Sequence, residues 1–271
     1  MASGEVMVNQ WERAARAWPI LTRTAASKTT ITYGELSAQL GLPHHRPLRY
    51  ALDKIHEYCL EAGLPPLTIV VVSRASGHPG AGFTAWDLGD WEDGVHLVYE
   101  YPWSLRLNPF AFAADGSTPE QLAGQLIDRP EDAAEIYGRI RDRGSAQRIF
   151  RLALLKAYQG RCAFCGLSLR AALEAAHIIP WSKASRAERV LPSNGLLLCS
   201  THHALFDASV LSVSEDLRIA CEQSRLPQHH WNEADRGAAL SLDGEPIAKP
   251  ADDRHRPSGA AFVRRVGLIS A

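Results

Sequence analysis

The sequence lacks the features of a membrane or secreted protein. No apolar run in its 271 residues approaches the roughly 18 residues that a membrane span needs. The first residues, MASGEVMVNQWERAARAW, do not have the basic and then apolar order of a secretion signal. Internal repeats and low-complexity tracts are also absent. We therefore expect a cytoplasmic globular protein without a membrane partner, long enough to form two modest domains.

The sequence also lacks a strong net charge, since 29 Lys and Arg residues oppose 30 Asp and Glu residues. A positive net charge is the usual sign of a nucleic-acid-binding protein, so the nearly neutral net charge of this chain does not indicate that function. The charge is nevertheless uneven, because segment 138–170 is strongly basic and segment 87–94 is acidic. Phosphates are bound by local patches of positive charge, whatever the net charge of the whole chain. Nucleic-acid binding is therefore not excluded.

The cysteines are few and odd in number, which argues against a disulfide framework in a cytoplasmic protein. The chain has five: Cys59, Cys162, Cys165, Cys199 and Cys221. Cys162 and Cys165 form a Cys-x2-Cys knuckle, and Cys199 with His202 supplies a second pair after 33 intervening residues (166–198). Burial of reduced cysteines as small apolar residues does not explain this paired spacing. The sequence therefore predicts a structural Zn²⁺ ion held by these four residues.

The N-terminal third has the pattern of a winged helix-turn-helix domain. Thr32 and Glu35 have the spacing of a capping box at the start of a short helix that Pro43 ends. A second helix follows within residues 46–64, and the β-branched run LTIVVVS (67–73) predicts a buried strand before a Gly/Pro loop. The apolar stripe expected on the second helix consists of Leu48, Ala51, Ile55, Cys59 and Leu60.

The same stretch weakly resembles the DNA-binding half of alkylguanine alkyltransferase-like proteins, through its TYGEL…LG…R helix pair and the following Gly-rich loop. The reactive Pro-Cys-His-Arg stretch of those enzymes is replaced here by PPLTIVVVSR, which has no cysteine. The resemblance thus implies a winged-helix fold and DNA contact, without alkyl transfer. The alternative is a helical domain that only stabilises the protein. Cys59 is expected to be a core residue.

Aromatic residues are concentrated in segment 84–113. Such side chains can stack on an extruded base, but they more often form a core or a domain interface. The residues are Trp86, Trp91, Tyr99, Tyr101, Trp103, Phe110 and Phe112.

Beyond this segment, the pattern predicts helices at about 119–127, 131–143 and 146–160. Two short strands are expected next, one ending near His177 and one entered through an Asn194-Gly195 turn, with a helix at STHHALFD. After about residue 222 the chain is polar and unpatterned, which predicts extended coil.

The motifs AAHIIPW, NGLLLC and HHALFD, framed by the Cys/His pairs, resemble an HNH nuclease over residues of about 146–215. The resemblance implies a ββα-metal fold that holds one divalent metal ion against the scissile phosphate. It makes His177 the general base, a role that suits a neutral imidazole. It also makes Asn194 a residue that orients the base or braces the loop, and His203 a ligand of the catalytic metal ion.

One position departs from the family pattern. Many members have an acidic residue or a histidine immediately before the base, where this chain has Ala176. Asp207 is a substitute ligand because it lies one helical turn after His203, and a structural role for Asp207 is equally open. Glu174 is a weaker candidate, since strand alternation puts it on the opposite face from His177. Because the protein offers few ligands, the sequence predicts a loosely held Mg²⁺ ion. Mn²⁺ or another divalent ion is the alternative.

Basic residues flank the predicted site. Each alone is explained by a solvated helix face, whereas the set favours contact with phosphates. The six residues are Arg148, Arg151, Lys156, Arg161, Lys183 and Arg186.

The sequence therefore predicts an α+β protein with four segments: a winged-helix-like DNA-recognition domain (1–113), a helical linker (114–144), an HNH nuclease domain (145–225) and a C-terminal extension (226–271). The expected function is metal-dependent cleavage of double-stranded DNA, as in a restriction enzyme, with dependence on base modification and homodimer formation as options. The alternative is a zinc-stabilised DNA-binding or regulatory protein whose nuclease site has decayed.

Overall fold

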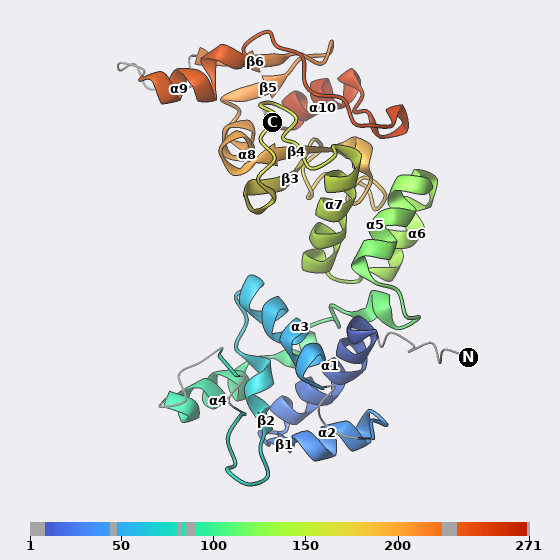
Figure 1. Ribbon diagram of the computed structural model, residues 1–271, viewed down its shortest axis with the longest axis vertical. Coiled ribbons are helices and arrows are strands. Elements are labelled where there is room, and N and C mark those ends of the chain that lie inside the picture. The colour runs from blue at the N-terminus through green and yellow to red at the C-terminus, as the bar shows by residue number, and fades with distance from the viewer. Residues whose placement is uncertain (1–8, 44–47, 81–82, 85–89, 224–231, 270–271) are drawn as a thin grey trace, which may run out of the picture. The chain divides into compact units, whose positions relative to one another are not determined.

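The computed structural model describes residues 9–43, 48–80, 83–84, 90–223 and 232–269 (Figure 1). The chain forms two compact units, one from residues 1–118 and 139–145 and the other from residues 119–138 and 146–271. Helices and strands both occur, as the predicted α+β class requires. Among the described residues, no helix combines the length and apolar character needed to cross a membrane. The predicted segment boundaries stay predictions.

The first unit is mainly helical. Its elements are α1 (Gln10–Ala26), β1 (Ile31–Thr32), α2 (Tyr33–Gln39), α3 (Leu48–Glu61), β2 (Val71–Val72) and α4 (Trp91–Glu100). Helix α1 begins after Asn9, whose side chain accepts hydrogen bonds from the backbone amides of Trp11 and Glu12. Thr32 and Glu35 form the capping box at the start of α2, which confirms the start predicted from their spacing.

The run 67–73, predicted as a strand, is a strand only near its end. Residues Leu67–Val70 form a 3-10 helix, and β2 pairs in parallel with β1 over two residues. The preceding Pro65 and Pro66 have no amide to donate to a strand ladder, and their carbonyls accept from Leu67 and Ile69 in local turns instead. The described part of this unit contains no antiparallel hairpin, so the winged-helix identity stays a prediction.

The aromatic segment supplies much of the first unit's core. Trp103, Phe110 and Phe112 are buried, and Trp18 of α1 makes edge contacts with Trp103 and Phe110 at ring-centroid distances of 5.9 Å each. Such packing explains these aromatic residues without base stacking. Trp86 lies outside the described residues.

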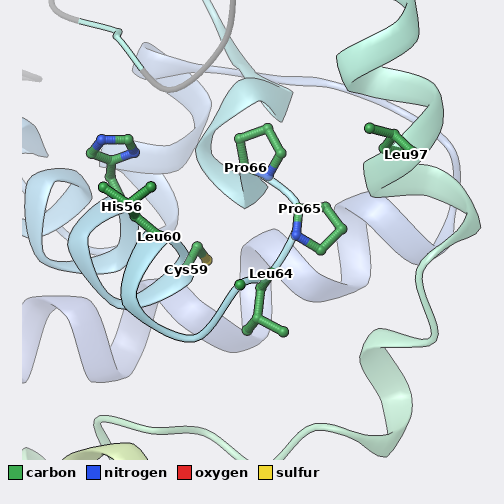
Figure 2. Close-up of a pocket in the computed structure, with 8 residues that line it drawn as sticks. His56, Cys59, Leu60, Leu64, Pro65, Pro66 and Leu97 are labelled. Carbon is green, nitrogen blue, oxygen red and sulfur yellow. The ribbon is translucent and has the colours of Figure 1, made fainter. Parts of the chain in front are cut away.

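Helix α3 buries its predicted stripe except at one position. Leu60 is 73% exposed, because it is rotated by about 100° from Cys59 on the helix. Leu60 lines a shallow hollow of about 390 Å³ together with Leu64, Pro66 and Leu97 (Figure 2). Cys59 is buried as predicted, and burial raises the pKa of its thiol to about 12. The thiol is therefore protonated at neutral pH and has the character of a core residue.

The second unit carries the predicted strand–strand–helix arrangement. Its elements are α5 (Pro119–Asp128), α6 (Ala133–Arg139), α7 (Arg143–Ala157), β3 (Leu173–His177), β4 (Gly195–Cys199), α8 (Ser200–Asp207), β5 (Leu211–Val213), β6 (Ile219–Cys221), α9 (Glu233–Ala238) and α10 (Gly259–Ile269). The first residues of α7 and the last of α6 are counted with the first unit. Strands β3 and β4 pair antiparallel, with His177 opposite Gly195, and α8 follows β4 directly.

The prediction of extended coil after residue 222 was wrong. The described part of this region contains α9 and α10 and packs on the second unit. The amides of Ala248 and Ala251 donate to the carbonyls of Ala163 and Ala157, and Phe262 of α10 is 1% exposed. The apolar residues that pack here are isolated among polar residues. The sequence therefore has no periodic apolar stripe from which the packing could be predicted.

Replacing Gly195 with alanine is expected to destabilise the second unit by about 1–3 kcal/mol, as overpacking of a core does. A Cβ atom at this position would lie 2.8 Å from a methyl carbon of Leu154 and would also clash with Phe150. Both residues are fully buried and have little room to move. The measurement is urea unfolding, with Gly138→Ala on the exposed face of α6 as the control.

No atom lies within 4 Å of a Cβ built at Gly138. The control is therefore expected to leave stability unchanged or to raise it by up to about 1 kcal/mol through helix propensity. Equal effects of the two substitutions would contradict the packing described at the start of β4.

Candidate functional site

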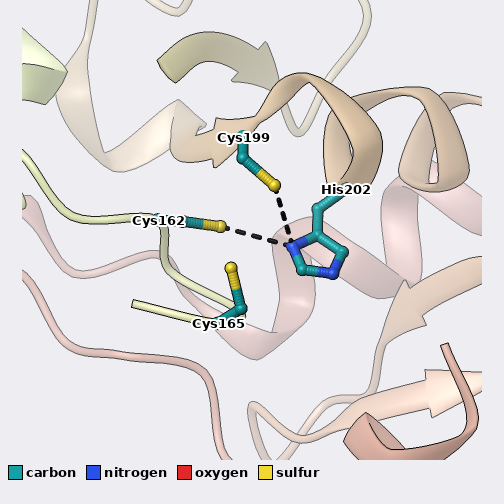
Figure 3. Close-up of side chains that lie close together, drawn as sticks. All are labelled: Cys162, Cys165, Cys199 and His202. Carbon is teal, nitrogen blue, oxygen red and sulfur yellow. Dashed lines mark hydrogen bonds between the residues drawn. The ribbon is translucent and has the colours of Figure 1, made fainter. Parts of the chain in front are cut away.

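Four predicted zinc ligands lie together in the second unit (Figure 3). Cys162 and Cys165 are on the turn after α7, Cys199 ends β4, and His202 is in the first turn of α8. Their ligand atoms all lie within 4.8 Å of one another. The amide of Gly166 donates to the Cys162 carbonyl, and Gly166 has a φ of 74°, which a glycine adopts without strain.

The distances within this cluster fit a tetrahedral ion. His202 Nδ1 lies 3.5 Å from Cys162 Sγ and 3.2 Å from Cys199 Sγ. Bond lengths of about 2.3 Å to sulfur and 2.05 Å to nitrogen give a tetrahedral edge of about 3.6 Å. His202 Nε2 lies 3.1 Å from the Ala238 carbonyl of α9. Because a carbonyl only accepts, the proton is on Nε2 and the Nδ1 lone pair faces the thiols. The group fits a structural zinc ion.

The thiols of the metal-free cluster titrate differently. Burial opposes ionisation of Cys162, but the contact of its thiol with the His202 ring and hydrogen bonds from backbone amides outweigh burial and lower the pKa of Cys162 to about 6. Burial and the neighbouring thiolate charge raise the pKa of Cys165 to about 12. One thiolate is thus available at neutral pH, and zinc binding must displace protons from the other cysteines.

His177, the predicted base, lies at the end of β3 within an aromatic enclosure. Its ring stacks on Phe150 at a centroid distance of 4.2 Å and meets Trp181 edge-on at 5.7 Å. Its Nε2 lies 3.0 Å from the backbone carbonyl of Arg189. Since the carbonyl accepts, the neutral ring carries its proton on Nε2 and its basic lone pair on Nδ1.

Arg189 fixes the carbonyl that contacts His177, and it was not identified from the sequence. Its guanidinium lies 5.4 Å from the ring centroid of Tyr137 and 5.1 Å from that of Trp181. It also donates to the Tyr137 hydroxyl at 2.8 Å. Cation–π contacts with two rings hold this arginine in one place, and its own backbone then positions the imidazole of His177.

Asn194 is 4% exposed and makes the contacts of a loop brace. Its Oδ1 accepts from the Ile179 amide at 2.9 Å, and its Nδ2 donates to the Glu188 carbonyl at 2.8 Å. These bonds close the long loop between β3 and β4. Asn194 therefore shapes the loop that carries Arg189.

His203 lies between two carboxylates. Its Nδ1 is 2.6 Å from Glu174 Oε2, and its Nε2 is 3.3 Å from Asp207 Oδ2. Glu174, the weaker candidate of the sequence, thus contacts His203 directly. Carboxylate groups suit Mg²⁺ or Mn²⁺, and imidazole suits transition-metal ions, although the two carboxylates contact opposite ring nitrogens of His203. His203 with either carboxylate forms a pair of ligands, and among the described residues only the Cys/His cluster gathers three or more.

The hydrogen bond to Asp207, supported by Glu174, raises the pKa of His203 although burial opposes the shift. The same bond lowers the pKa of Asp207. A histidine whose pKa is raised by folding stabilises the folded protein fully at pH values below its pKa in the unfolded chain, about 6.5. This stabilisation is lost as the pH rises. An aspartate whose pKa is lowered by folding stabilises the folded protein fully at pH values above its pKa in the unfolded chain, about 3.9. This stabilisation is lost as the pH falls. The pair therefore stabilises the metal-free site most between about pH 4 and pH 6.5.

Unfolding of wild-type protein and of His203→Gln, both without added divalent ion, checks this pH dependence. The difference in their unfolding free energies is expected to shrink as the pH is raised from 6 to 9. Comparing the two proteins at each pH cancels the titration of the other groups. A difference that stays constant over this range would contradict the ion pair.

Two of the predicted phosphate-binding residues, Arg151 and Lys156, make hydrogen bonds to backbone carbonyls. Arg151 donates to the carbonyls of Leu173 and Arg170, each at 2.8 Å, and so holds the start of β3. Lys156 Nζ lies 3.3 Å from the Glu120 carbonyl. The other side chains are exposed or half-buried: Arg148, Arg161, Lys183 and Arg186. Their contact with phosphates stays a prediction.

Comparison with known families agrees with this geometry. Residues 162–214 match the model of a family described as HNH endonuclease. The matched stretch contains the Cys/His cluster, strands β3 and β4, and helix α8. It is an HNH endonuclease domain, which implies a phosphodiester hydrolase acting on nucleic acid. A comparison with curated proteins found no match to the chain.

Proposed function

We propose that the protein is a metal-dependent DNA endonuclease. The observation that carries this proposal is the position of His177 inside the HNH domain, with Nε2 bonded to a backbone carbonyl and the ring held between Phe150 and Trp181. A histidine fixed in this tautomer can take a proton from water through Nδ1. The hydroxide formed attacks the phosphorus atom, the bond from phosphorus to the 3′ oxygen breaks, and the 3′ oxygen takes a proton from solvent.

His203 is the proposed ligand of the catalytic divalent ion, with Asp207 or Glu174 as its partner. When bound, the ion supplies positive charge that stabilises the phosphate and the leaving 3′ oxygen. His203 must lose its proton to act as a ligand, so the carboxylates that raise its pKa also make protons compete with the metal ion. Asn194 keeps the Arg189 loop closed around the base, and it is a positioning residue in this scheme.

The finer assignments are also proposals. The first unit recognises DNA as a winged-helix-like domain, and the protein acts in restriction, with a modified base as one option for its target. Arg148, Arg161, Lys183 and Arg186 contact phosphates along the bound strand. A homodimer would allow both strands to be cut.

Digestion of plasmid and oligonucleotide DNAs tests the proposed activity. DNAs that differ in methylation are incubated with full-length protein and Mg²⁺ or Mn²⁺, and the cut sites are mapped. Cleavage that requires the added ion and maps to defined sites is expected. A preparation with bound zinc that cuts none of these DNAs, with either ion, would contradict the proposal.

A decayed nuclease that only binds DNA is the second candidate. It is favoured by Ala176, which leaves the position before the base without a ligand, and by the engagement of both ring nitrogens of His203 with carboxylates. Binding of DNA in a gel-shift assay without cleavage under any of the above conditions would support this candidate.

A further inference from the structure

Arg265 is a buried cation beside the HNH site, although it belongs to the C-terminal helix α10. It is 7% exposed, and it lies 51 residues beyond the end of the matched segment at residue 214 (265 − 214). Its guanidinium stacks 3.9 Å from the ring centroid of Phe206 in α8. The C-terminal helix therefore contributes a charged group to the interior of the nuclease unit.

The guanidinium connects the two elements that carry the proposed chemistry. One nitrogen, Nη1, donates to the carbonyls of His177 and Ile178 at 2.9 and 3.0 Å. The other, Nη2, donates to the Phe206 carbonyl at 3.2 Å and lies 3.3 Å from Asp207 Oδ1. The first pair fixes the end of β3 at the base, and the second fixes the end of α8 at Asp207.

Stability alone gives a poor reason for a charge at this position. Burying a guanidinium costs desolvation energy, and apolar residues of similar volume in such places are often neutral or stabilising. Arginine differs from an apolar residue or a lysine because its planar fork donates in several fixed directions. Here the fork reaches three carbonyls and one carboxylate on two elements.

We propose that Arg265 is a positioning residue of the nuclease site, which sets the spacing between His177 on β3 and the His203–Asp207 pair on α8. This inference rests on the proposed function. It makes α10 a part of the nuclease site, although the helix lies outside the matched HNH segment. Residues that orient metal ligands from the second layer of a site typically contribute 10–100-fold to metal affinity or activity.

The test compares Arg265→Met and Arg265→Lys with Arg264→Met in the full-length protein. Arg264 is the neighbouring arginine on the exposed face of α10 and pairs with Glu188. We measure kcat and KM for DNA at saturating metal ion, and Mn²⁺ affinity from the electron paramagnetic resonance signal of free Mn²⁺. Zinc content and the melting temperature show that each variant is folded under the assay conditions.

Arg265→Met is expected to lower kcat and Mn²⁺ affinity by roughly 10–100-fold each, with KM for DNA within about twofold of wild type. Arg265→Lys is expected to recover part of each loss, and Arg264→Met to behave as wild type. A merely structural role would lower the melting temperature without this separation of kcat from KM. Wild-type kcat and Mn²⁺ affinity in folded Arg265→Met, or equal losses in Arg264→Met, would overturn the proposal.

If Arg265→Met does not fold, Arg265→Lys decides, because lysine keeps the charge but donates from one nitrogen only. Unchanged kcat and Mn²⁺ affinity in that variant would then overturn the proposal. If wild-type protein cleaves no DNA, the proposed function fails, and the comparison of Mn²⁺ affinities still tests Arg265. Wild-type protein that binds no Mn²⁺ would refute the positioning role as well.

Discussion

Replacing His177 with alanine is expected to reduce the rate of DNA cleavage by about a thousandfold, within the range of roughly 10²–10⁴ that general base catalysis contributes. The substitution removes the group proposed to take a proton from the attacking water. The zinc-ligand cluster and the His203 pair are expected to stay intact, because the contacts that form them are made by other side chains. Metal and DNA binding are therefore expected to persist.

The ring of His177 also packs on Phe150, so alanine leaves a cavity that could disturb the site by itself. His177→Asn is the companion variant, because it keeps a polar side chain of intermediate volume and is likewise expected to be inactive. Single-turnover cleavage is measured for both variants with zinc content and melting temperature on the same preparations. Cleavage by either folded variant within about tenfold of wild type would remove His177 as the base.

Removal of the zinc ion is expected to unfold the HNH domain. The four candidate ligands come from the knuckle after α7, the end of β4 and the start of α8, so a bound ion would join these elements. Structural zinc sites contribute about 10–16 kcal/mol of apparent binding energy in zinc-finger peptides, which is comparable to or larger than the whole stability of a domain. Cys199→Ser should therefore lose the ion together with the folded state of the second unit.

Cys221→Ser is the matched control for that variant. Cys221 lies in β6, is partly exposed, and does not belong to the Cys/His cluster. The control is expected to bind one zinc ion per chain and to melt as wild type, by atomic absorption and circular dichroism. A Cys199→Ser protein that melts as wild type would show that the cluster has no structural ion.

The Cys/His cluster and the strand–strand–helix arrangement of the HNH domain were largely predictable from local spacing. Two pairs of ligands, each with two residues between its members, can serve one ion only if the fold brings the pairs together, and β3, β4 and α8 do so. The prediction that His202 and His203 have separate roles rests on their 100° rotation on one helix. Strand alternation led us to place Glu174 on the opposite face from His177. It did not predict that Glu174 would lie 2.6 Å from His203, because this contact depends on how α8 packs on the strands.

Contacts between distant segments were not predictable in the same way. Arg265 reaches the carbonyl of His177 across 88 positions, and a carbonyl has no signature in the sequence. The one available signal was a charged pair inside the otherwise apolar stretch AAFVRRVGLI, where one arginine must face the protein. Arg189 is similar, since its effect on His177 passes through the main chain. The run 67–73 failed as a strand because the two prolines before it favour a turn.

The assignment of the adjacent histidines to two different metal ions is the central claim, and a paired substitution tests it most directly. His202→Ala and His203→Ala are prepared in parallel, and zinc content, melting temperature and cleavage of the same plasmid are measured on each sample. His202→Ala is expected to lose zinc and unfold, whereas His203→Ala keeps one zinc ion per chain and its melting transition but no longer cleaves. Loss of zinc from both proteins, or wild-type cleavage by His203→Ala, would contradict the assignment.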